Sequence, residues 1–323
     1  LLRTELKINR IYWIACGASC TEASMWRKSA TVLLRRSMPI TCGRNICGKR
    51  GGMNKQIDFT DCRRITGKAY NGANGKKIAV EYNGRQYMLK FPPSGKAKPT
   101  ELSYINSCIS EHIASSIYNF LGVPAQETML GTFTLEKNVK VVCACLDFTS
   151  DDKQFFDFCS IKNTVLDSDS NGSGTELEDI IETIEKQQFV PPDKLMEHFW
   201  NMFIIDALLG NFDRHNGNWG FLYNAKKQQG EIAPVYDCGS CLLPQADEKI
   251  MQSLLADKDV LHARVFQFPT SAIKLNGRKI NYYDFLTKTE NRDCIRALRR
   301  IRDRIDRKQI EAFIDTVPYI SDL

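Results

Sequence analysis

The sequence predicts an α+β fold with two lobes, a small β-rich lobe over residues 53–147 and a larger, mainly helical lobe over residues 148–323. Strand-like runs joined by turns are concentrated in the first part, and long apolar helical patterns in the second. With 323 residues, of which 43% are apolar and 25% charged, the chain can bury a substantial core. Its longest apolar segments are interrupted and do not reach the ~20 residues of a membrane helix. We therefore expect a cytoplasmic protein without a membrane span, with export to a host cell as the open alternative.

Residues 1–52 differ in composition from the rest of the chain. They contain ten Lys/Arg and two Asp/Glu, although the formal net charge of the whole chain is only +6. The remaining residues are therefore slightly acidic, and the positive charge gives no reason to expect nucleic acid as a partner of the folded domain. We interpret residues 1–52 as a non-native or disordered leader and place the native start at Met53, with a basic targeting arm as the alternative.

A β-hairpin is predicted near the start of the first lobe. Residues 78–82 and 85–91 have the composition of strands, and the pair Asn83-Gly84 lies between them. Asn-Gly suits a type I′ turn because both central positions of that turn need a positive φ. Lys90 lies at the end of the second strand, and its interpretation depends on the motif described below.

Three glycines precede the hairpin in a polar stretch. With Gly67, Gly72 and Gly75, the backbone N–H groups of this stretch could approach phosphate oxygens without a Cβ in the way. The spacing fits neither G-x-G-x-x-G nor the Walker pattern, so an ordinary turn remains the alternative to a phosphate-covering loop.

Residues 100–121 are predicted to form a helix. Apolar side chains recur there at three- and four-residue steps, which gives one apolar stripe, and Gly122 ends the pattern. Glu111 lies in the middle of this helix and Glu101 near its start. We expect Glu111 to reach Lys90 and keep Glu101 as its rival. A solvated helical carboxylate is the simpler interpretation of each.

Two further strands are predicted over residues 126–133 and 139–146. The second is apolar and β-prone toward its end, which indicates a buried interior strand. A polar segment beginning at Asp147 follows directly. If the two lobes enclose a nucleotide, this segment is the hinge between them, and its backbone would bind the adenine. We therefore assign Cys145 and Asp147 to the cofactor-binding residues.

Four helical patterns are predicted in the second lobe, over residues 176–188, 191–209, 247–262 and 292–317. The pattern over 191–209 is the most apolar and indicates a helix in the core of the lobe. It ends at Gly210, where a short polar loop begins. A strand-like run starts inside that loop.

The loop and the segment that follows it contain the clearest chemical signal. Asp213 and Asn218 lie five positions apart, and Asp237 follows nineteen residues later in an Asp-x-Gly. Phosphoryl transfer uses this arrangement, in which the first Asp handles the acceptor hydroxyl while the Asn and the second Asp hold Mg²⁺. Lys90 then takes the position of the lysine that pairs with nucleotide phosphates, and Glu111 that of its partner. A polar turn with Asx capping is the alternative for each loop residue taken alone.

The twelve cysteines are expected to be reduced thiols, because most lie in apolar contexts without regular spacing. Cys238 and Cys241 form a lone C-x-x-C, and no second pair completes a four-ligand zinc site. A zinc or redox protein is therefore the most distant alternative.

Several motifs together carry a family resemblance. They are Asp213-Arg-His-Asn-Gly-Asn218, Asp237-Cys-Gly239, Ser110-Glu-His-Ile113 and Ala233-Pro-Val-Tyr-Asp237. Taken in chain order, they resemble the HipA-like Ser/Thr kinases, and among them the short stand-alone CtkA-type proteins. The element Asp-Arg-His-x-x-Asn is also similar to one in phosphatidylinositol kinases.

The resemblance implies a two-lobed protein-kinase-like fold and the ATP- and Mg-dependent phosphorylation of Ser/Thr hydroxyls in protein, including autophosphorylation. Asp213 matches the catalytic aspartate, and Asn218 and Asp237 match the Mg²⁺ ligands. Lys90 matches the phosphate lysine, and His215 a position that orients the loop. The extra amino-terminal subdomain of full-length HipA toxins is not expected, which leaves toxin activity and antitoxin binding open.

Two alternatives to a protein kinase remain open at this point. One is a lipid or small-molecule kinase with the same catalytic residues, because acceptor choice has no motif in the sequence. The other is a non-catalytic ATP-binding interaction module, although Lys90, Asp213, Asn218 and Asp237 are all present. The expected partners are a protein substrate and the chain itself, with no nucleic acid.

Overall fold

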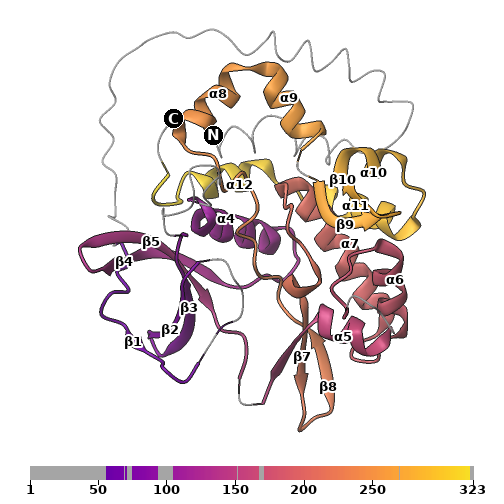
Figure 1. Ribbon diagram of the computed structural model, residues 1–323, viewed down its shortest axis with the longest axis horizontal. Coiled ribbons are helices and arrows are strands. Elements are labelled where there is room, and N and C mark those ends of the chain that lie inside the picture. Colours follow the sequence, from indigo (N-terminus) through magenta and orange to yellow (C-terminus); the bar gives the residue numbers. More distant parts are fainter. Residues whose placement is uncertain are drawn as a thin grey trace.

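The computed structural model describes residues 56–68, 70, 75–93, 105–150, 152–166, 171–268 and 270–320. The predicted leader, the start at Met53, Gly72 and Glu101 lie outside the described residues. The described chain forms a sheet-rich lobe, at the lower left of Figure 1, and a mainly helical lobe at its right. The predicted α+β, two-lobed fold is thereby confirmed.

An antiparallel five-stranded sheet in the order β1-β2-β3-β5-β4 forms the first lobe. The predicted hairpin is confirmed, since β2 pairs with β3 and the turn has positive φ at Asn83 (49°) and Gly84 (72°). β5 is an interior strand, as predicted, and pairs with both β3 and β4. The strands are β1 (Arg63–Arg64), β2 (Lys77–Tyr82), β3 (Arg85–Lys90), β4 (Thr128–Leu135) and β5 (Asn138–Leu146).

Helix α4 (Ser107–Phe120) packs against β4 and β5 and also contacts the second lobe. Ile113 and Ile117 of its predicted apolar stripe are fully buried. On the side facing the second lobe, the Tyr118 hydroxyl donates to a carboxylate oxygen of Asp206 at 2.8 Å. A helix of the sheet-rich lobe thus has a direct polar bond to the core of the helical lobe.

The two ends of α4 are also bonded to the second lobe. At the start, Asn106 Nδ2 donates to the Ala246 carbonyl at 2.7 Å. At the end, Arg304 Nη1 donates to the Leu121 carbonyl at 3.0 Å. The ring of Phe313 packs against Phe120 in addition. These contacts fix α4 along its whole length.

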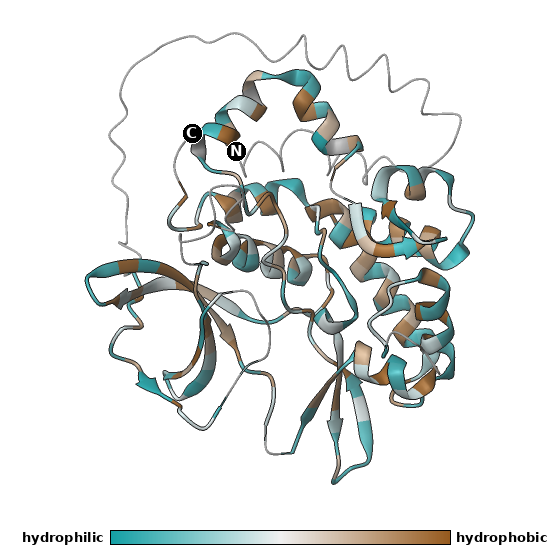
Figure 2. Cartoon of the chain, in the orientation of Figure 1, coloured by the Kyte–Doolittle hydropathy of each residue, from teal (hydrophilic) through white to brown (hydrophobic). Residues whose placement is uncertain are grey.

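Helix α7 (Pro192–Leu209) forms the core of the second lobe, as predicted, and its carboxy-terminal half is buried. Figure 2 shows apolar residues on the helices and strands that face the interior of each lobe. Proline suits the first position of the helix, where its missing N–H has no partner to lose. Gly210 ends the helix and starts the loop that contains Asp213 and Asn218.

Two of the predicted helices are each divided in two. The pattern over 247–262 forms α8 and α9, because the Asp257 carboxylate accepts backbone N–H groups at the start of the second helix. The pattern over 292–317 likewise forms α11 and α12, with Asp306 as the cap of the second helix. An aspartate offers the backbone an alternative partner and begins a new helix instead of continuing the old one.

The strand-like run that was expected in the loop is β7. It joins β6 and β8 in a three-stranded sheet, and β9 and β10 form a separate hairpin. The patterns did not predict β6, β8, β9 and β10, nor the helices α5 and α10. The helices are α5 (Phe158–Val165), α6 (Leu177–Lys186), α8 (Glu248–Ala256), α9 (Lys258–Phe266), α10 (Tyr282–Lys288), α11 (Arg292–Asp303) and α12 (Arg307–Ile314). The strands are β6 (Gln154–Asp157), β7 (Gly220–Asn224), β8 (Gln229–Ile232), β9 (Thr270–Leu275) and β10 (Arg278–Asn281).

Among the described helices, none has both the length and the apolar character that crossing a bilayer requires.

Candidate active site

The loop after α7 holds Asp213 and Asn218 in one hydrogen-bonded turn. The Asn211 side chain accepts the Asp213 N–H at 3.0 Å, and the Asn218 amide donates to the Asp213 carbonyl at 2.8 Å. The short 3-10 helix η1 (Asn216–Asn218) closes the turn, and Asn218 is buried. The five-residue spacing thus corresponds to a compact turn fixed by two asparagine side chains.

Lys90 is the ion-pairing centre of the site. Its Nζ lies 2.9 Å from Glu111 Oε2 and 2.9 Å from Asp237 Oδ1. Burial by itself lowers the pKa of Lys90, but the charges of Asp237 and Glu111 outweigh burial and hold that pKa well above its usual value. The Lys90 charge in turn lowers the pKa of Asp237 to about 2, against the opposing effect of burial. The structure therefore brings the predicted Lys90–Glu111 pair together and adds Asp237 from the second lobe.

Asp213 has the opposite electrostatic character. Burial raises its pKa above the ordinary value; the charge of His215 opposes this shift, and that of Asp237 adds to it. Arg214 and Lys279 exert smaller opposing effects. Two neighbouring carboxyl groups whose pKa values are pushed apart are suited to different chemical roles. Asp237 is the one that stays ionised, as a cation-binding group must.

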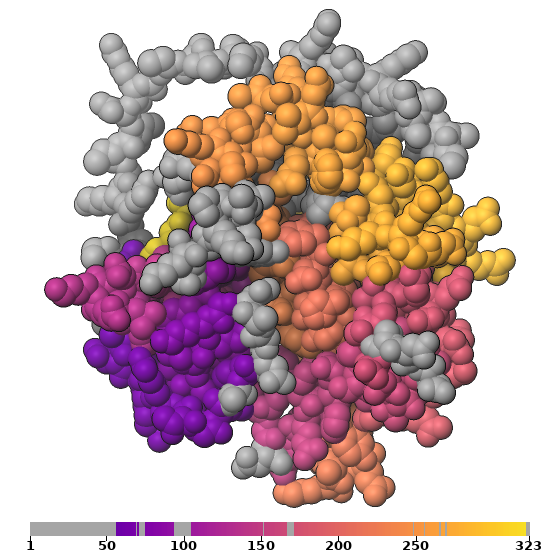
Figure 3. Space-filling view, viewed as in Figure 1, coloured from indigo at the N-terminus to yellow at the C-terminus, as the bar shows by residue number. Residues whose placement is uncertain are grey.

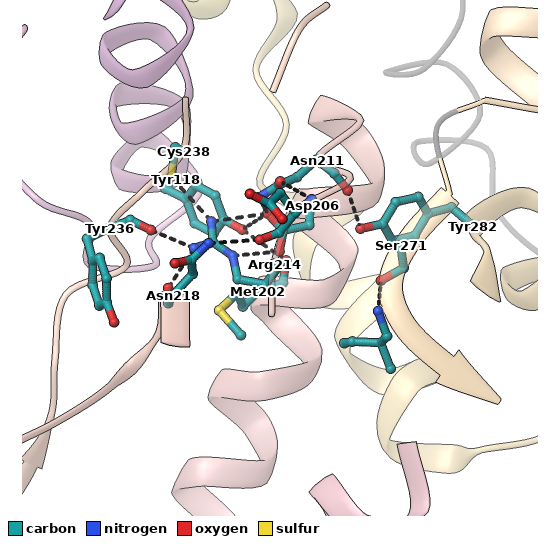
Figure 4. Close-up of polar contacts among 12 residues, drawn as sticks. Tyr118, Met202, Asp206, Asn211, Arg214, Asn218, Tyr236, Cys238, Ser271 and Tyr282 are labelled. Carbon is teal, nitrogen blue, oxygen red and sulfur yellow. Dashed lines mark hydrogen bonds and ion pairs between the residues drawn. The ribbon is translucent and has the colours of Figure 1, made fainter. Parts of the chain in front are cut away.

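Arg214 connects the two loops that carry the predicted metal-binding residues (Figure 4). Its Nη1 donates to the carbonyl oxygens of Asn218 at 2.7 Å and Tyr236 at 2.5 Å, and its Nε donates to Asp206 Oδ2 at 3.0 Å. Its Nη2 lies 3.4 Å from Cys238 Sγ. One buried guanidinium thus holds the backbone at Asn218 and Tyr236 and contacts the side chain of Cys238, so it touches both neighbours of Asp237.

Arg214 and Asp206 were not among the predicted site residues. The available signal was the position of Asp206, a charged residue in the most apolar helix, since a buried charge requires a partner. His215, which was predicted to orient the loop, is exposed, and its ring nitrogen accepts the Gly217 N–H at 3.1 Å as the cap of η1. Arg214 adds contacts that reach across the site.

Two side chains near the start of the glycine stretch, Lys68 and Tyr70, contact Asp147 of the predicted hinge. The sequence did not indicate either of them. The Tyr70 hydroxyl donates to Asp147 Oδ2 at 2.7 Å, and Lys68 forms an ion pair with the same carboxylate. A Cβ at Gly75 (φ +71°) would lie 2.6 Å from the Phe91 carbonyl oxygen. The close approach of the backbone at Phe91 is therefore enough to require glycine at this position. Around Gly67 there is open space.

The two predicted hinge residues have different environments. Cys145 is fully buried, with its Sγ 3.8 Å from Cys143 Sγ. The backbone N–H of Asp147 donates to the Gln86 carbonyl at 2.9 Å, which extends the β3–β5 pairing. The Asp147 carboxylate is thus held by Tyr70 and Lys68, and the Cys145 thiol is buried on the Lys90 face of the sheet, in the core that includes α4.

Lys77 is a further cation of the site that the sequence did not indicate. It lies directly opposite Lys90 in the β2–β3 pairing, so both side chains extend from the same face of the sheet. Burial lowers the pKa of Lys77, and the nearby Lys90 charge lowers it further, whereas Asp237 and Glu111 oppose both effects. The strand alternation, counted back from Lys90 through the turn, was the signal that could have identified it.

The oxygen donors at the site are few. Within the described residues, no group of three or more His, Cys, Asp or Glu side chains is arranged as a metal cage. Cys238 and Cys241 are both buried, and Cys238 faces Arg214. The groups suited to a hard divalent cation are therefore the Asp237 carboxylate and the Asn218 amide oxygen.

Comparisons with known proteins identify the family of this chain. The profile of the HipA-like C-terminal domain family matches residues 69–316. The serine/threonine-protein kinase CtkA of Helicobacter pylori strain J99 is 49% identical over 268 residues, which make up 83% of this chain and 81% of that protein. The crystal structure of a Helicobacter pylori proinflammatory kinase CtkA matches with a TM-score of 0.77 and 47% identity, over 83% of this chain and 89% of that chain.

A Shewanella oneidensis MR-1 complex of HipA, HipB and operator DNA is a more distant match, with a TM-score of 0.46 and 14% identity over 85% of this chain and 69% of that chain. The family is shown by the domain profile, which covers well over half of the chain, and by the identity to CtkA. The chain belongs to the HipA-like serine/threonine protein kinases.

Proposed function

We propose that this kinase transfers the γ-phosphoryl group of ATP to Ser/Thr hydroxyls of protein substrates, itself included, with Mg²⁺ as its metal. The observation that carries the proposal is the position of Lys90, 2.9 Å from both Glu111 and Asp237. Kinases need the lysine–glutamate pair and the metal-binding aspartate in place together before phosphoryl transfer can proceed. The ion pairs thus join the three predicted groups across the two lobes.

Each predicted residue has a proposed role in this reaction. Asp213 orients the acceptor hydroxyl and accepts its hydrogen bond, and Asn218 and Asp237 hold the metal. Lys90 binds the nucleotide phosphates, with Lys77 as a second cation beside it. We place the nucleotide between the lobes 53–147 and 148–323. The glycine stretch from Gly67 to Gly75 lies over the phosphates, and the hinge at Cys145–Asp147 lies at the adenine.

The donor set supports Mg²⁺ bound together with a triphosphate. Mg²⁺ prefers carboxylate and amide oxygens and completes its coordination with phosphate oxygens and water, so it needs few protein ligands. When bound, the metal would neutralise charge on the phosphate oxygens. The protein's own contribution is to position the acceptor through Asp213 and to hold the phosphates with lysines.

The test is incubation of the purified protein with γ-labelled ATP and Mg²⁺, alone and with a mixture of Ser/Thr peptides, followed by mapping of the labelled residues. The proposal expects label on Ser/Thr of the peptides and of the chain, and no label with the Asp213→Ala variant. Label found only in added lipids or small molecules would instead identify a lipid or small-molecule kinase. Nucleotide binding without any transfer would identify a non-catalytic module.

A further inference from the structure

The β9–β10 hairpin concentrates positive charge in a domain that is slightly acidic beyond residue 52. Residues 270–281 contain Lys274, Arg278 and Lys279 and no aspartate or glutamate. This hairpin lies on the surface of the second lobe, in the orange-to-yellow region at the right of Figure 3. Residues 270–281 therefore carry only positive charges.

The hairpin is attached to the catalytic loop by a buried hydrogen bond. The hydroxyl of Tyr282, the residue that follows β10, donates to the Asn211 carbonyl at 2.7 Å (Figure 4). Tyr282 is only 4% exposed. Asn211 in turn holds the Asp213 backbone N–H through its side chain. Two contacts therefore fix the position of the hairpin relative to the catalytic aspartate.

Two lysines of the hairpin lie directly opposite each other. The β9–β10 register pairs Lys279 with Lys274, so the two side chains extend from the same face. Like charges in directly opposite positions destabilise a strand pair. Within the described part of the chain neither lysine forms an ion pair. The nearest acid by backbone pairing is Glu176, and its carboxylate accepts the Gly277 N–H at the hairpin turn.

Lys279 lies on the accessible side of this hairpin. The next residue, Ile280, is 4% exposed, whereas Lys279 is exposed, as strand alternation requires. Lys279 lies three residues before Tyr282, whose hydroxyl bonds to the Asn211 carbonyl, so the lysine belongs to the element that is fixed to the loop of Asp213. An unfavourable lysine pair beside the acceptor site is the arrangement expected where a bound anion supplies the missing charge.

We propose that Lys274 and Lys279 bind acidic side chains that flank the acceptor Ser/Thr, so that this kinase prefers acidic acceptor segments. The proposal rests on the proposed function, because it places the acceptor hydroxyl at Asp213. A role on the nucleotide phosphates is assigned to Lys90 and Lys77, which lie in the other lobe. The hairpin lysines are therefore specificity-determining residues for the protein substrate.

The test compares two synthetic peptides with the same central serine. One has Asp and Glu on both sides of the serine, and the other has Asn and Gln in their place. We expect the wild-type protein to show the higher kcat/KM for the acidic peptide. In the variant Lys274→Gln/Lys279→Gln that preference should fall by roughly threefold to tenfold, because one exposed ion pair is worth a factor of about 1.5 to 5. The preference should also weaken at high salt.

Two controls separate this role from a structural or nucleotide-binding one. Lys288→Gln removes an exposed lysine of α10, the helix that follows the hairpin, and should keep the acidic preference. The charge reversal Lys279→Glu should disfavour the acidic peptide. Equal losses for both peptides, a raised KM for ATP in the double variant, or no acidic preference in the wild type would overturn the proposal.

A binding measurement keeps the inference separate from the proposed function. Fluorescence anisotropy of the two labelled peptides on the Asp213→Ala protein requires no phosphoryl transfer. Tighter binding of the acidic peptide that depends on the two lysines supports the hairpin site even if transfer to peptides were absent. Equal binding of the two peptides contradicts the hairpin site even if phosphorylation is observed.

Discussion

Arg214 and Asp206 form an ion pair at 3.0 Å in which each side chain is only 1% exposed. The pair joins the core helix α7 to the catalytic loop. Through its other nitrogens, Arg214 holds the carbonyls of Asn218 and Tyr236, next to the two proposed metal ligands. The pair is therefore placed to set the geometry of the metal site as well as the stability of the lobe.

Removing one partner of this pair should be strongly destabilising. Asp206→Ala leaves the Arg214 guanidinium buried without a carboxylate, a change that typically costs about 3–5 kcal/mol. Urea unfolding followed by circular dichroism measures the loss. The double variant Asp206→Leu/Arg214→Met should recover much of that stability, since apolar pairs often replace buried ion pairs at little cost. It should still have a raised KM for Mg²⁺, and an unchanged Mg²⁺ dependence would contradict the positioning role.

The two aspartates of the site should be required for activity but not for folding. We expect Asp213→Ala and Asp237→Ala each to lower kcat by roughly 10²- to 10⁴-fold, the usual range for acid–base and electrostatic groups. Radiolabel transfer from ATP gives the rate, and thermal melting reports the fold. Retention of near wild-type phosphate incorporation by Asp213→Ala would show that its assignment is wrong.

Asp213→Asn should also raise the melting temperature. The raised pKa of Asp213 means that the folded state holds a proton there more tightly than the unfolded state does. The ionised form therefore costs stability at neutral pH, and a neutral isostere removes that cost. Differential scanning calorimetry at neutral pH without metal measures the shift. A lower melting temperature for Asp213→Asn would contradict the electrostatic interpretation.

Lys90→Met should act on nucleotide binding and on stability together. The substitution leaves Glu111, which is 1% exposed, without its cation at 2.9 Å. We expect a large rise in the KM for ATP and a lower melting temperature. Adding Glu111→Gln to Lys90→Met removes the unpaired buried charge, so it should restore melting temperature without restoring activity. Restored activity would show that Lys90 does not contact the nucleotide.

Lowering the pH should begin to destabilise the fold at a higher pH than the one at which most carboxylates become protonated. Burial, with a further contribution from the Arg214 charge, lowers the pKa of His198 from 6.5 to about 4. A depressed folded-state pKa contributes stability that is fully present above the unfolded value and is lost as pH falls through the folded one. The free energy of unfolding should therefore decline between about pH 6.5 and 4. His198→Gln should flatten that decline, and an identical pH profile would exclude His198 as its source.

The sequence was most informative where side-chain periodicity and motif spacing coincide. Glu111 was found from its position in the middle of the predicted helix, and Lys90 from the end of a hairpin strand. Arg214 was missed because its role depends on carbonyl groups from two loops, which no sequence pattern encodes. The β9–β10 hairpin was missed because its strands are short and its apolar residues are few. The divisions at Asp257 and Asp306 show that one capping side chain can interrupt an otherwise continuous apolar stripe.

The contacts of α4 also concern how this kinase is controlled. A regulatory switch needs an element with two arrangements of similar free energy. Helix α4 is bonded to the second lobe at Asn106, Tyr118 and Leu121, so displacing Glu111 would require breaking several contacts at once. The Lys90–Glu111 pair therefore does not have the character of such a switch. We expect control of activity to act on the access of nucleotide and acceptor, and not on the position of α4.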